Sequence, residues 1–346
     1  MRTGSLILLA ALAVAPLRGD AQAPLDPLWG PDQRETRAVL LRIDGRIAAK
    51  RYAPGYSDTN RFISWSMAKT VTALLVGELV ADGRLALDAP APIAEWQGDS
   101  RRAITVRHLL HMSSGLRHIE VGTPVENSDT NQVLFVSGPQ AMAAAAIARP
   151  LADRPGTRFR YDTLTSVILA EIVTRTLTDS RDPRVRAAAY RAFAEARLFR
   201  PAGVRGAFLE FDGAGTQIGG SIIHMPLDDW GRMGELLIDG RGADGSQVIA
   251  PAWLAFLKAP APTNPEYGGH LWLNRPPADG DDPVLFPAKG LPGLVSMNGH
   301  LGQFVMAVEQ DGRRVVMVRL GNTPDGRLDG VIDRMGDVIV AATAGR

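Results

Sequence analysis

The sequence predicts an α+β fold, with one antiparallel sheet formed from the N- and C-terminal segments, flanked by helices, and a mainly helical region inserted between them. Three observations lead to this prediction. A strand-turn-strand pattern occurs near each end of the chain, and helical apolar spacing dominates the middle. Hydrophobic residues make up 45% and charged residues 22% of the 346 residues, which is typical of a folded globular protein with a substantial core.

The first 23 residues predict a cleaved signal peptide. Arg2 precedes an apolar run from Leu6 to Ala15, and Ala21-Gln22-Ala23 fits the small-x-small pattern of a signal-peptidase site. The apolar run is short for a membrane span, so an uncleaved anchor is the less favoured alternative. We therefore expect a periplasmic or secreted protein, cleaved after Ala23, whose residues 24–346 form a single domain.

The two ends of this domain read as β-hairpins. Residues 38–52 contain two β-prone runs about Asp44-Gly45, and residues 303–321 contain two more about Asp311-Gly312. An Asp-Gly pair tolerates the positive φ angles of a tight hairpin turn. Residues 328–344 follow with helical apolar spacing, which predicts a closing helix packed on the sheet.

The segment between the hairpins is predicted to be mainly helical, with an inserted helical region at roughly residues 84–205. A helix is expected to begin near residue 67 and to stop at Gly83, because Val71, Leu74, Leu75 and Val80 recur at helical spacing. Residues 164–177 and 227–239 show similar apolar stripes. Joins rich in proline and glycine separate these helices.

Charge and cysteine content exclude several classes of partner and chemistry. The net charge of +1, without runs of like charge, gives no signature of nucleic-acid or membrane binding, so we expect a small-molecule partner. The absence of cysteine excludes disulfides, a thiol nucleophile and a cysteine-ligated metal. We expect no cofactor.

A serine and a lysine three residues apart, Ser66 and Lys69, are candidates for nucleophilic catalysis. Lysine is rare in this chain, with four among 38 basic residues, so its use at position 69 instead of arginine favours a property that arginine lacks. Burial can lower the pKa of a lysine until the neutral amine accepts a proton. Both residues fall at the start of the predicted helix, one turn apart, where the amine could activate the hydroxyl. Alternatively, Ser66 is a plain N-cap and Lys69 a solvated first-turn residue.

Two further motifs follow Ser66-Met67-Ala68-Lys69 in a fixed order. Tyr161-Asp162-Thr163 lies at a turn that leads into a helix, and His300-Leu301-Gly302 directly precedes the C-terminal hairpin. With these motifs and residues 105–116, the chain from about 37 to 320 resembles the serine β-lactamase and penicillin-recognising fold. It resembles in particular the branch that contains class C β-lactamases, D,D-peptidases, family VIII esterases and 6-aminohexanoate-dimer hydrolases.

The resemblance implies a set of roles. Ser66 would become acylated, Lys69 would be its base, and Tyr161 would share the proton and deliver it to the leaving group. The oxyanion hole would consist of the backbone N–H groups of Ser66 and of Gln303 on the edge strand.

The resemblance also implies a substrate-binding wall. His300 and Gly302 would line the cleft opposite Tyr161, and the glycine would leave room for substrate. His300 stands where typical β-lactamases have a lysine, so a mostly neutral group replaces the cation that suits a β-lactam carboxylate. Thr163, in place of asparagine or serine, keeps a hydroxyl but binds amides less well.

Other polar residues give weaker signals. Asp129, in a loop predicted to border the cleft, is a possible substrate contact. His108, His111 and His118 lie close in sequence, but no acidic partner has ligand spacing, and we predict no metal site.

Together these features predict an exported serine hydrolase that forms an acyl-enzyme on small carboxylic esters or amides. One alternative is a D,D-peptidase or a weak β-lactamase. An alternative of another class is a binding or sensor protein that keeps the fold without turnover.

Overall fold

The computed structural model describes residues 23–30 and 33–344. The predicted signal peptide lies, except for Ala23, outside the described residues. No described helix is both long and apolar enough to cross a membrane.

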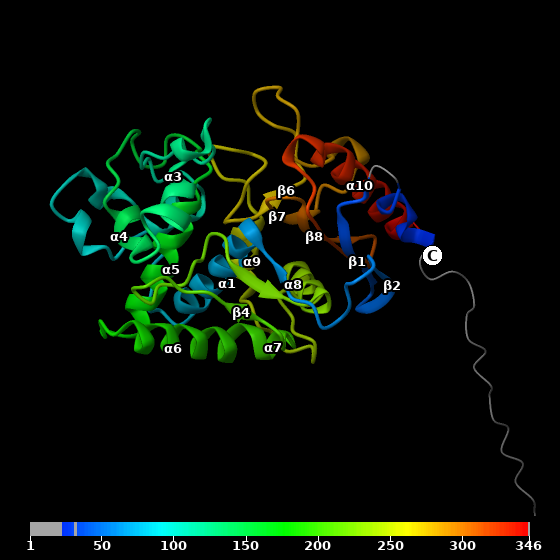
Figure 1. Cartoon of the computed structure of the whole chain (residues 1–346), viewed down its shortest axis with the longest axis horizontal. Coiled ribbons are helices and arrows are strands. Elements are labelled where there is room, and N and C mark those ends of the chain that lie inside the picture. Colours follow the sequence, from blue (N-terminus) through cyan, green and yellow to red (C-terminus); the bar gives the residue numbers. More distant parts are fainter. Residues whose placement is uncertain (1–22, 31–32, 345–346) are drawn as a thin grey trace, which may run out of the picture.

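A six-stranded antiparallel sheet joins the two ends of the chain, as predicted, with the strand order β2-β1-β9-β8-β7-β6. Figure 1 shows the blue N-terminal strands beside the orange C-terminal ones. The strands are β1 (Thr36–Ile43), β2 (Arg46–Tyr52), β6 (Trp272–Leu273), β7 (Val295–Gly299), β8 (Gln303–Gln310) and β9 (Arg313–Gly321). Strand β1 pairs with β9, which closes the sheet between segments nearly 300 residues apart.

Both predicted hairpins are confirmed, and their turns have the expected backbone. Asp44 and Gly45 have φ values of 49° and 78°, and Asp311 and Gly312 have values of 52° and 77°. Two consecutive residues in the left-handed region are the mark of a type I′ turn, whose twist matches that of the flanking strands.

The sheet is buried on both faces, with side chains that alternate between two apolar clusters. On β8 and β9, Val305 and Val318 face one cluster with α8, whereas Met306 and Met317 face the other with α10. Helix α10 (Leu328–Ala344) is the predicted closing helix, and α8 (Leu227–Asp239) covers the opposite face.

The remaining helices lie between β2 and β6 in the sequence, mostly on the α8 side of the sheet (Figure 1). They are α1 (Ala68–Ala81), α2 (Val106–Leu110), α3 (Asp129–Asn131), α4 (Met142–Ile147), α5 (Thr163–Leu177), α6 (Pro183–Ala194), α7 (Arg200–Ala202) and α9 (Pro251–Lys258). A small second sheet, order β3-β5-β4, consists of β3 (Phe62–Ile63), β4 (Phe208–Leu209) and β5 (Ile223–Met225). This second sheet was not predicted.

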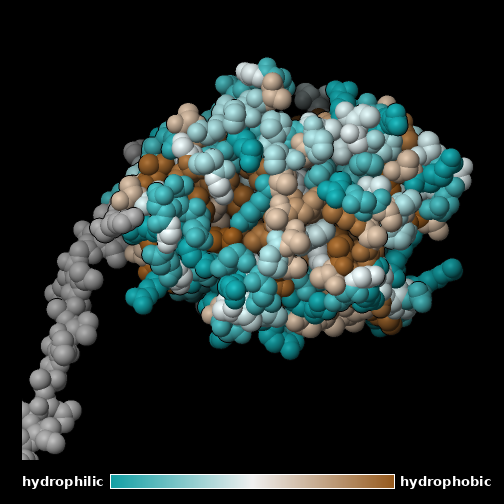
Figure 2. All heavy atoms as spheres, turned by 180° about the vertical axis from the view of Figure 1, so that it is seen from behind, coloured by the Kyte–Doolittle hydropathy of each residue, from teal (hydrophilic) through white to brown (hydrophobic). Residues whose placement is uncertain are grey.

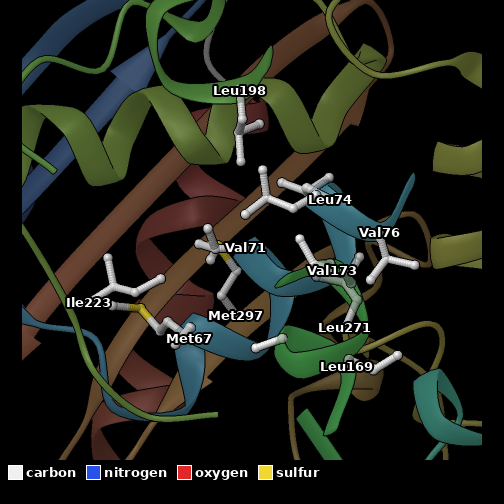
Figure 3. Packing of buried hydrophobic residues seen from close by; sticks show 14 of the residues in the cluster. Met67, Val71, Leu74, Val76, Leu169, Val173, Leu198, Ile223, Leu271 and Met297 are labelled. Carbon is white, nitrogen blue, oxygen red and sulfur yellow. The ribbon is translucent and has the colours of Figure 1, made fainter. Parts of the chain in front are cut away.

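Helix α1 is the centre of the molecule and is buried on all sides over most of its length, not on one face as its apolar spacing suggested. In Figure 3, Val71 and Leu74 of α1 lie among side chains of α5 and of the sheet, including Val173 and Met297. On the face shown in Figure 2, polar and charged side chains cover much of the surface, with apolar patches between them. A rigid central helix suits a catalytic residue at its start, because the surrounding core fixes its position.

Candidate active site

Ser66 lies in a 3₁₀ turn, Trp65–Met67, that runs directly into α1. Trp65 has a φ of 44°, which is unusual for a bulky residue and marks a locally strained backbone. The N-cap position of α1 belongs to Met67, without a side-chain capping bond. The interpretation of Ser66 as a plain N-cap is therefore wrong, and its hydroxyl instead faces Lys69.

Lys69 is buried, and three oxygen atoms surround its amine. Nζ lies 2.8 Å from each of Ser66 Oγ, Thr163 Oγ1 and the carbonyl oxygen of Gly220. Burial lowers the pKa of Lys69 to about 8, against the opposing effect of the Glu120 and Asp162 carboxylates. The alternative of a solvated first-turn lysine is also wrong, and a fraction of the amine is neutral at physiological pH.

Tyr161 precedes α5, as predicted, and lies close to both Ser66 and Lys69. Its hydroxyl hydrogen-bonds Ser66, and Lys69 Nζ lies 4.9 Å from its ring centroid. Burial raises its pKa well above the usual value, assisted by the charge of Glu120, so the phenol stays protonated at neutral pH. Trp272 stacks on the ring at 5.8 Å and holds its plane.

Thr163 connects Lys69 to a carboxylate that sequence reasoning missed. Its hydroxyl donates to Glu120 Oε1 at 2.5 Å, and its backbone N–H donates to Glu120 Oε2 at 2.8 Å. Asp162, between Tyr161 and Thr163, caps α5 by accepting from two backbone N–H groups. The Tyr161-Asp162-Thr163 motif therefore supplies a ring, a helix cap and a hydroxyl to one site.

Ser66, Tyr161, Glu120 and Trp272 border a cleft of about 1070 Å³ between the helical region and the sheet. Its lining combines apolar side chains with carboxylates, and Lys289 is the one lysine or arginine among the described lining residues. The Lys289 ammonium is paired with Asp333 at 2.8 Å and with Asp337 at 2.5 Å. The lining residues are Ser66, Glu120, Val121, Tyr161, Trp272, Asp282, Pro283, Val284, Leu285, Phe286, Pro287, Ala288, Lys289, Asn298, Gly299, His300, Phe304, Leu328, Asp329, Ile332 and Asp333.

The sheet meets the cleft at the end of β7 and the residue after it, through Asn298, Gly299 and His300. His300 lines the cleft as expected, and its ring lies edge-on to Trp65 at 5.4 Å. Gly299 lies so close to the turn that carries Ser66 that a Cβ atom on it would stand 2.3 Å from the Ser64 carbonyl oxygen. A glycine of β7 therefore lies directly against the turn that carries Ser66.

The expectations for Gln303 and Gly302 need correction, because His300-Leu301-Gly302 forms the turn between β7 and β8. Gln303 is buried on β8, an interior strand, where it pairs with Gly299 and its side-chain amide binds turn carbonyl groups. Gly302 makes room for the buried Arg319 guanidinium, not for substrate, since a Cβ atom there would lie 2.2 Å from Arg319 Nη1. Neither residue borders the cleft.

Asp129 is not placed to contact a substrate. One of its oxygens pairs with Arg149 at 2.6 Å, and the other accepts the backbone N–H of Ile119 at 2.8 Å. The carboxylate therefore stabilises its own loop and does not line the cleft, contrary to the predicted substrate contact.

The three histidines do not gather in one place. His108 caps α2, and His111 stacks on Phe256. His118 instead lies with Glu120 and Asp162, whose nearest ligand atoms are within 4.8 Å of one another. Both carboxylates already accept hydrogen bonds from protein groups, so we assign no metal to this cluster.

Glu120 and Gly220 are the site residues that sequence reasoning missed. Glu120 follows the family-like segment 105–116 by four residues, and Gly220 ends a Gly-Gly pair. The glycine is required, because a Cβ atom on Gly220 would lie 2.5 Å from the Thr163 carbonyl oxygen. The Gly-Gly pair was therefore a usable signal for close backbone approach.

Comparison with known proteins agrees with this geometry. The β-lactamase family model matches residues 25–341. The chain is 23% identical, over 75% of its length and 68% of the relative's, to a 6-aminohexanoate-dimer hydrolase of Paenarthrobacter ureafaciens.

Solved structures show the same fold at low sequence identity. A putative 6-aminohexanoate-dimer hydrolase from Bacillus anthracis superposes with a TM-score of 0.70 at 19% identity, over 89% of this chain and 80% of that one. EstCE1, described as a hydrolase with promiscuous acyltransferase activity, superposes at 0.66 with 17% identity, over 94% of this chain and 99% of that one. The chain belongs to the β-lactamase family and is a hydrolase of the β-lactamase fold.

Proposed function

We propose that this protein is an exported serine hydrolase that forms an acyl-enzyme at Ser66 with small carboxylic esters or amides. The observation that carries the proposal is the buried Lys69 amine, with its lowered pKa, 2.8 Å from Ser66 Oγ. A serine hydroxyl is a weak nucleophile until a nearby base accepts its proton. A lysine in this environment supplies such a base near neutral pH.

In the proposed reaction, neutral Lys69 takes the proton of Ser66 as Oγ attacks the substrate carbonyl carbon. As the tetrahedral intermediate collapses and the bond to the leaving group breaks, protonated Tyr161 gives its proton to the leaving group and takes one from the Lys69 ammonium, so that both residues return to their starting states. Water then attacks the acyl-enzyme and loses a proton to Lys69, which returns it to Ser66 Oγ as the acyl bond breaks. Tyr161 thus acts as a relay and Lys69 as the base, because the raised pKa of the phenol disfavours a phenolate.

The developing oxyanion needs backbone donors on the Ser66 side of the cleft. One of these donors would be the backbone N–H of Ser66. The second donor would be a backbone N–H at the end of β7, from Asn298 or His300. The intervening Gly299 directs its carbonyl group to the turn before β8, where it accepts a hydrogen bond from the backbone N–H of Gly302. Backbone groups alternate in direction along a strand, so those of Asn298 and His300 point away from β8.

The cleft charges favour substrates without a carboxylate. Glu120, Asp282 and Asp329 line the cleft, and the Lys289 ammonium is already paired. The carboxylate of a penicillin-like substrate would be repelled by these negative charges, and position 300 holds a histidine and not the lysine that would bind this carboxylate. We therefore place esters and small amides ahead of β-lactams and D-alanyl peptides.

Turnover of p-nitrophenyl esters, nitrocefin and D-alanyl peptides by the purified protein tests this order. We expect ester hydrolysis to exceed nitrocefin hydrolysis by at least about 100-fold in kcat/KM, a difference of about 3 kcal/mol. Faster nitrocefin turnover would favour the β-lactamase alternative, and no turnover of any substrate would favour a binding or sensor protein.

Export is proposed on the sequence of residues 1–23 alone. Expression of the full chain in a Gram-negative host, followed by osmotic shock and N-terminal sequencing, tests it. We expect periplasmic protein that begins at Pro24, whereas full-length protein in the cytosol would contradict export.

A further inference from the structure

The Thr163 hydroxyl has one proton and two close partners, so its direction is fixed. Glu120 Oε1 lies 2.5 Å away and Lys69 Nζ 2.8 Å away. The Glu120 carboxylate can only accept, because its hydrogen bonds with His118 and Thr163 and the charge of Lys69 overcome burial and lower its pKa to about 2. Thr163 therefore donates to Glu120, and its oxygen can only accept from Lys69.

The second fixed partner of Lys69 is also an acceptor. The Gly220 carbonyl oxygen lies 2.8 Å from Nζ and has no proton to give. A neutral amine has two N–H bonds and one lone pair. With its two N–H bonds directed to Thr163 Oγ1 and Gly220 O, its lone pair is left for Ser66 Oγ.

We propose that Glu120 is a positioning residue for the reaction: by holding the Thr163 proton, it directs the lone pair of neutral Lys69 at Ser66. The inference rests on the proposed function, since it assigns a role within the same site. Glu120 needs no contact with the reacting atoms to act in this way. It acts through a single hydroxyl, which is the third residue of the Tyr161-Asp162-Thr163 motif.

The position of Glu120 is itself secured by several donors. Oε2 accepts from the Thr163 backbone N–H at 2.8 Å and from Thr130 Oγ1 at 2.8 Å, and lies 2.7 Å from His118 Nε2. Glu120 lines the cleft, and hydrogen bonds hold its two carboxylate oxygens to the first residue of α5 and to the segment that contains His118 and Thr130. The carboxylate is held in one orientation before substrate arrives.

Replacing Glu120 by glutamine should reverse the direction of the Thr163 hydroxyl. The backbone N–H of Thr163 requires an acceptor, so the amide oxygen takes the Oε2 position and the amide NH₂ faces Thr163 Oγ1. The hydroxyl proton then turns towards Lys69 and occupies the lone pair needed by Ser66. The substitution also removes a negative charge that raises the Lys69 pKa.

The variant should therefore show two effects at once. The high-pH plateau of kcat/KM should fall at least about tenfold, because general-base catalysis as a whole is worth about 10² to 10⁴. The acid limb of the pH profile should move to lower pH.

The titratable groups that face Lys69 are Tyr161, Glu120, Asp162 and His270, and His118 faces Glu120. The moved limb reports the lost charge of Glu120, whereas the lowered plateau reports the lost orientation of Lys69. A merely structural role of Glu120 would not be reproduced by Thr163→Val and spared by Thr163→Ser.

The experiment measures the rate of fluorophosphonate labelling of Ser66 from pH 5 to 10, by intact mass, beside ester kcat/KM. The variants are Glu120→Gln, Thr163→Ser, Thr163→Val and, as a matched control, Glu210→Gln. Glu210 directly follows β4 and forms a comparable pair with His224 of β5, 2.6 Å apart and outside the cleft. The control should keep wild-type rates and the wild-type pH profile.

The two threonine variants keep the inference testable if Glu120→Gln fails to fold. Thr163→Ser preserves the hydroxyl and should retain at least about a third of the wild-type rate, whereas Thr163→Val should lose at least about tenfold. Wild-type-like labelling by Thr163→Val, or by folded Glu120→Gln with an unmoved acid limb, would overturn the inference alone. An unlabelled wild-type Ser66 would overturn the proposed function as well.

Discussion

Lys69 is the residue on which the proposed chemistry depends, because its surroundings both lower its pKa and orient its amine. Two of its three oxygen partners cannot give up a proton to it in the arrangement seen here, and the third, Ser66 Oγ, is the proposed nucleophile. Arginine in the same place would keep the positive charge but could not accept the proton of Ser66.

Lys69→Arg is therefore expected to lower kcat/KM for p-nitrophenyl esters by about 10² to 10⁴. Steady-state kinetics measures this loss of kcat/KM, and a thermal melt checks that the variant is folded. A folded variant with near-normal turnover would refute a base role for Lys69. Lys258→Arg is the matched control, since Lys258 donates to the Ile238 carbonyl away from the cleft and should keep wild-type turnover.

The wild-type pH profile follows from the same residue. Lys69 must be deprotonated to accept a proton, and its pKa is lowered to about 8. We expect kcat/KM to rise with pH and to level off above about 8. A profile that is flat from pH 6 to 9 would contradict the assignment.

At the scale of elements, β7 and the turn before α1 are in unusually close contact. The Ser64 carbonyl leaves no room for a Cβ atom on Gly299. Gly299→Ala should therefore displace the Ser66 turn and cost at least about tenfold in kcat/KM, because small displacements of reacting groups are expensive.

Gly293→Ala provides the control for this substitution. Gly293 has no heavy atom within 4 Å of an added Cβ and lies just before β7. Its variant should keep wild-type kcat/KM. Equal activity of Gly299→Ala and the control would mean that the contact with Ser64 does not position the nucleophile.

The segment 119–136 places exposed apolar side chains beside the cleft. Val121 lines the cleft and is 83% exposed, and Phe135, 50% exposed, lies edge-on to Trp65 at 6.5 Å. An acyl chain leaving the cleft could bury this surface. We expect octanoyl esters to exceed acetyl esters in kcat/KM, and Phe135→Ala to reduce that preference by roughly twofold to fivefold, as for about one buried methylene.

Phe208→Ala is the matched control for this prediction. Phe208 is 54% exposed and belongs to β4, outside the cleft. The control should leave the chain-length preference unchanged. An unchanged preference in Phe135→Ala as well would show that the segment does not contact the acyl chain.

Local patterns in the sequence were sufficient for the elements that form locally. The Asp-Gly turns and the helices α1, α5, α8 and α10 fall where periodicity and turn chemistry predict them. Strands β3, β4 and β6 are two residues long each, too short to show a period, and were not predicted.

The site was predictable where a motif carries it and not where it depends on distant contacts. Ser66, Lys69, Tyr161 and Thr163 come together as expected. Gly220 reaches Lys69 across 151 residues of sequence. Nothing local could show that contact, or that His300-Leu301-Gly302 would form a turn and place the preceding residues of β7 in the cleft.

At the scale of the whole molecule, the buried lysine makes stability depend on pH. The folded state releases the Lys69 proton near pH 8 and the unfolded state near 10.5, so the unfolded state binds more protons in between. Stability from this group rises with pH across that window, by roughly 3 kcal/mol for a lowering from 10.5 to about 8.

Lys69→Met isolates this contribution. The difference in unfolding free energy, wild type minus variant, should rise by roughly 3 kcal/mol between pH 7.5 and 11, because other groups largely cancel in the difference. Urea denaturation at several pH values measures it. A difference that does not change with pH would mean that Lys69 titrates at its ordinary value in the folded protein.

The central claim is that Ser66 is an activated nucleophile. Intact-mass spectrometry of the wild type and of Ser66→Ala after fluorophosphonate treatment tests it most directly. The account predicts one adduct on the wild type and none on the variant. No adduct on folded wild type, or an equal adduct on both proteins, would contradict it.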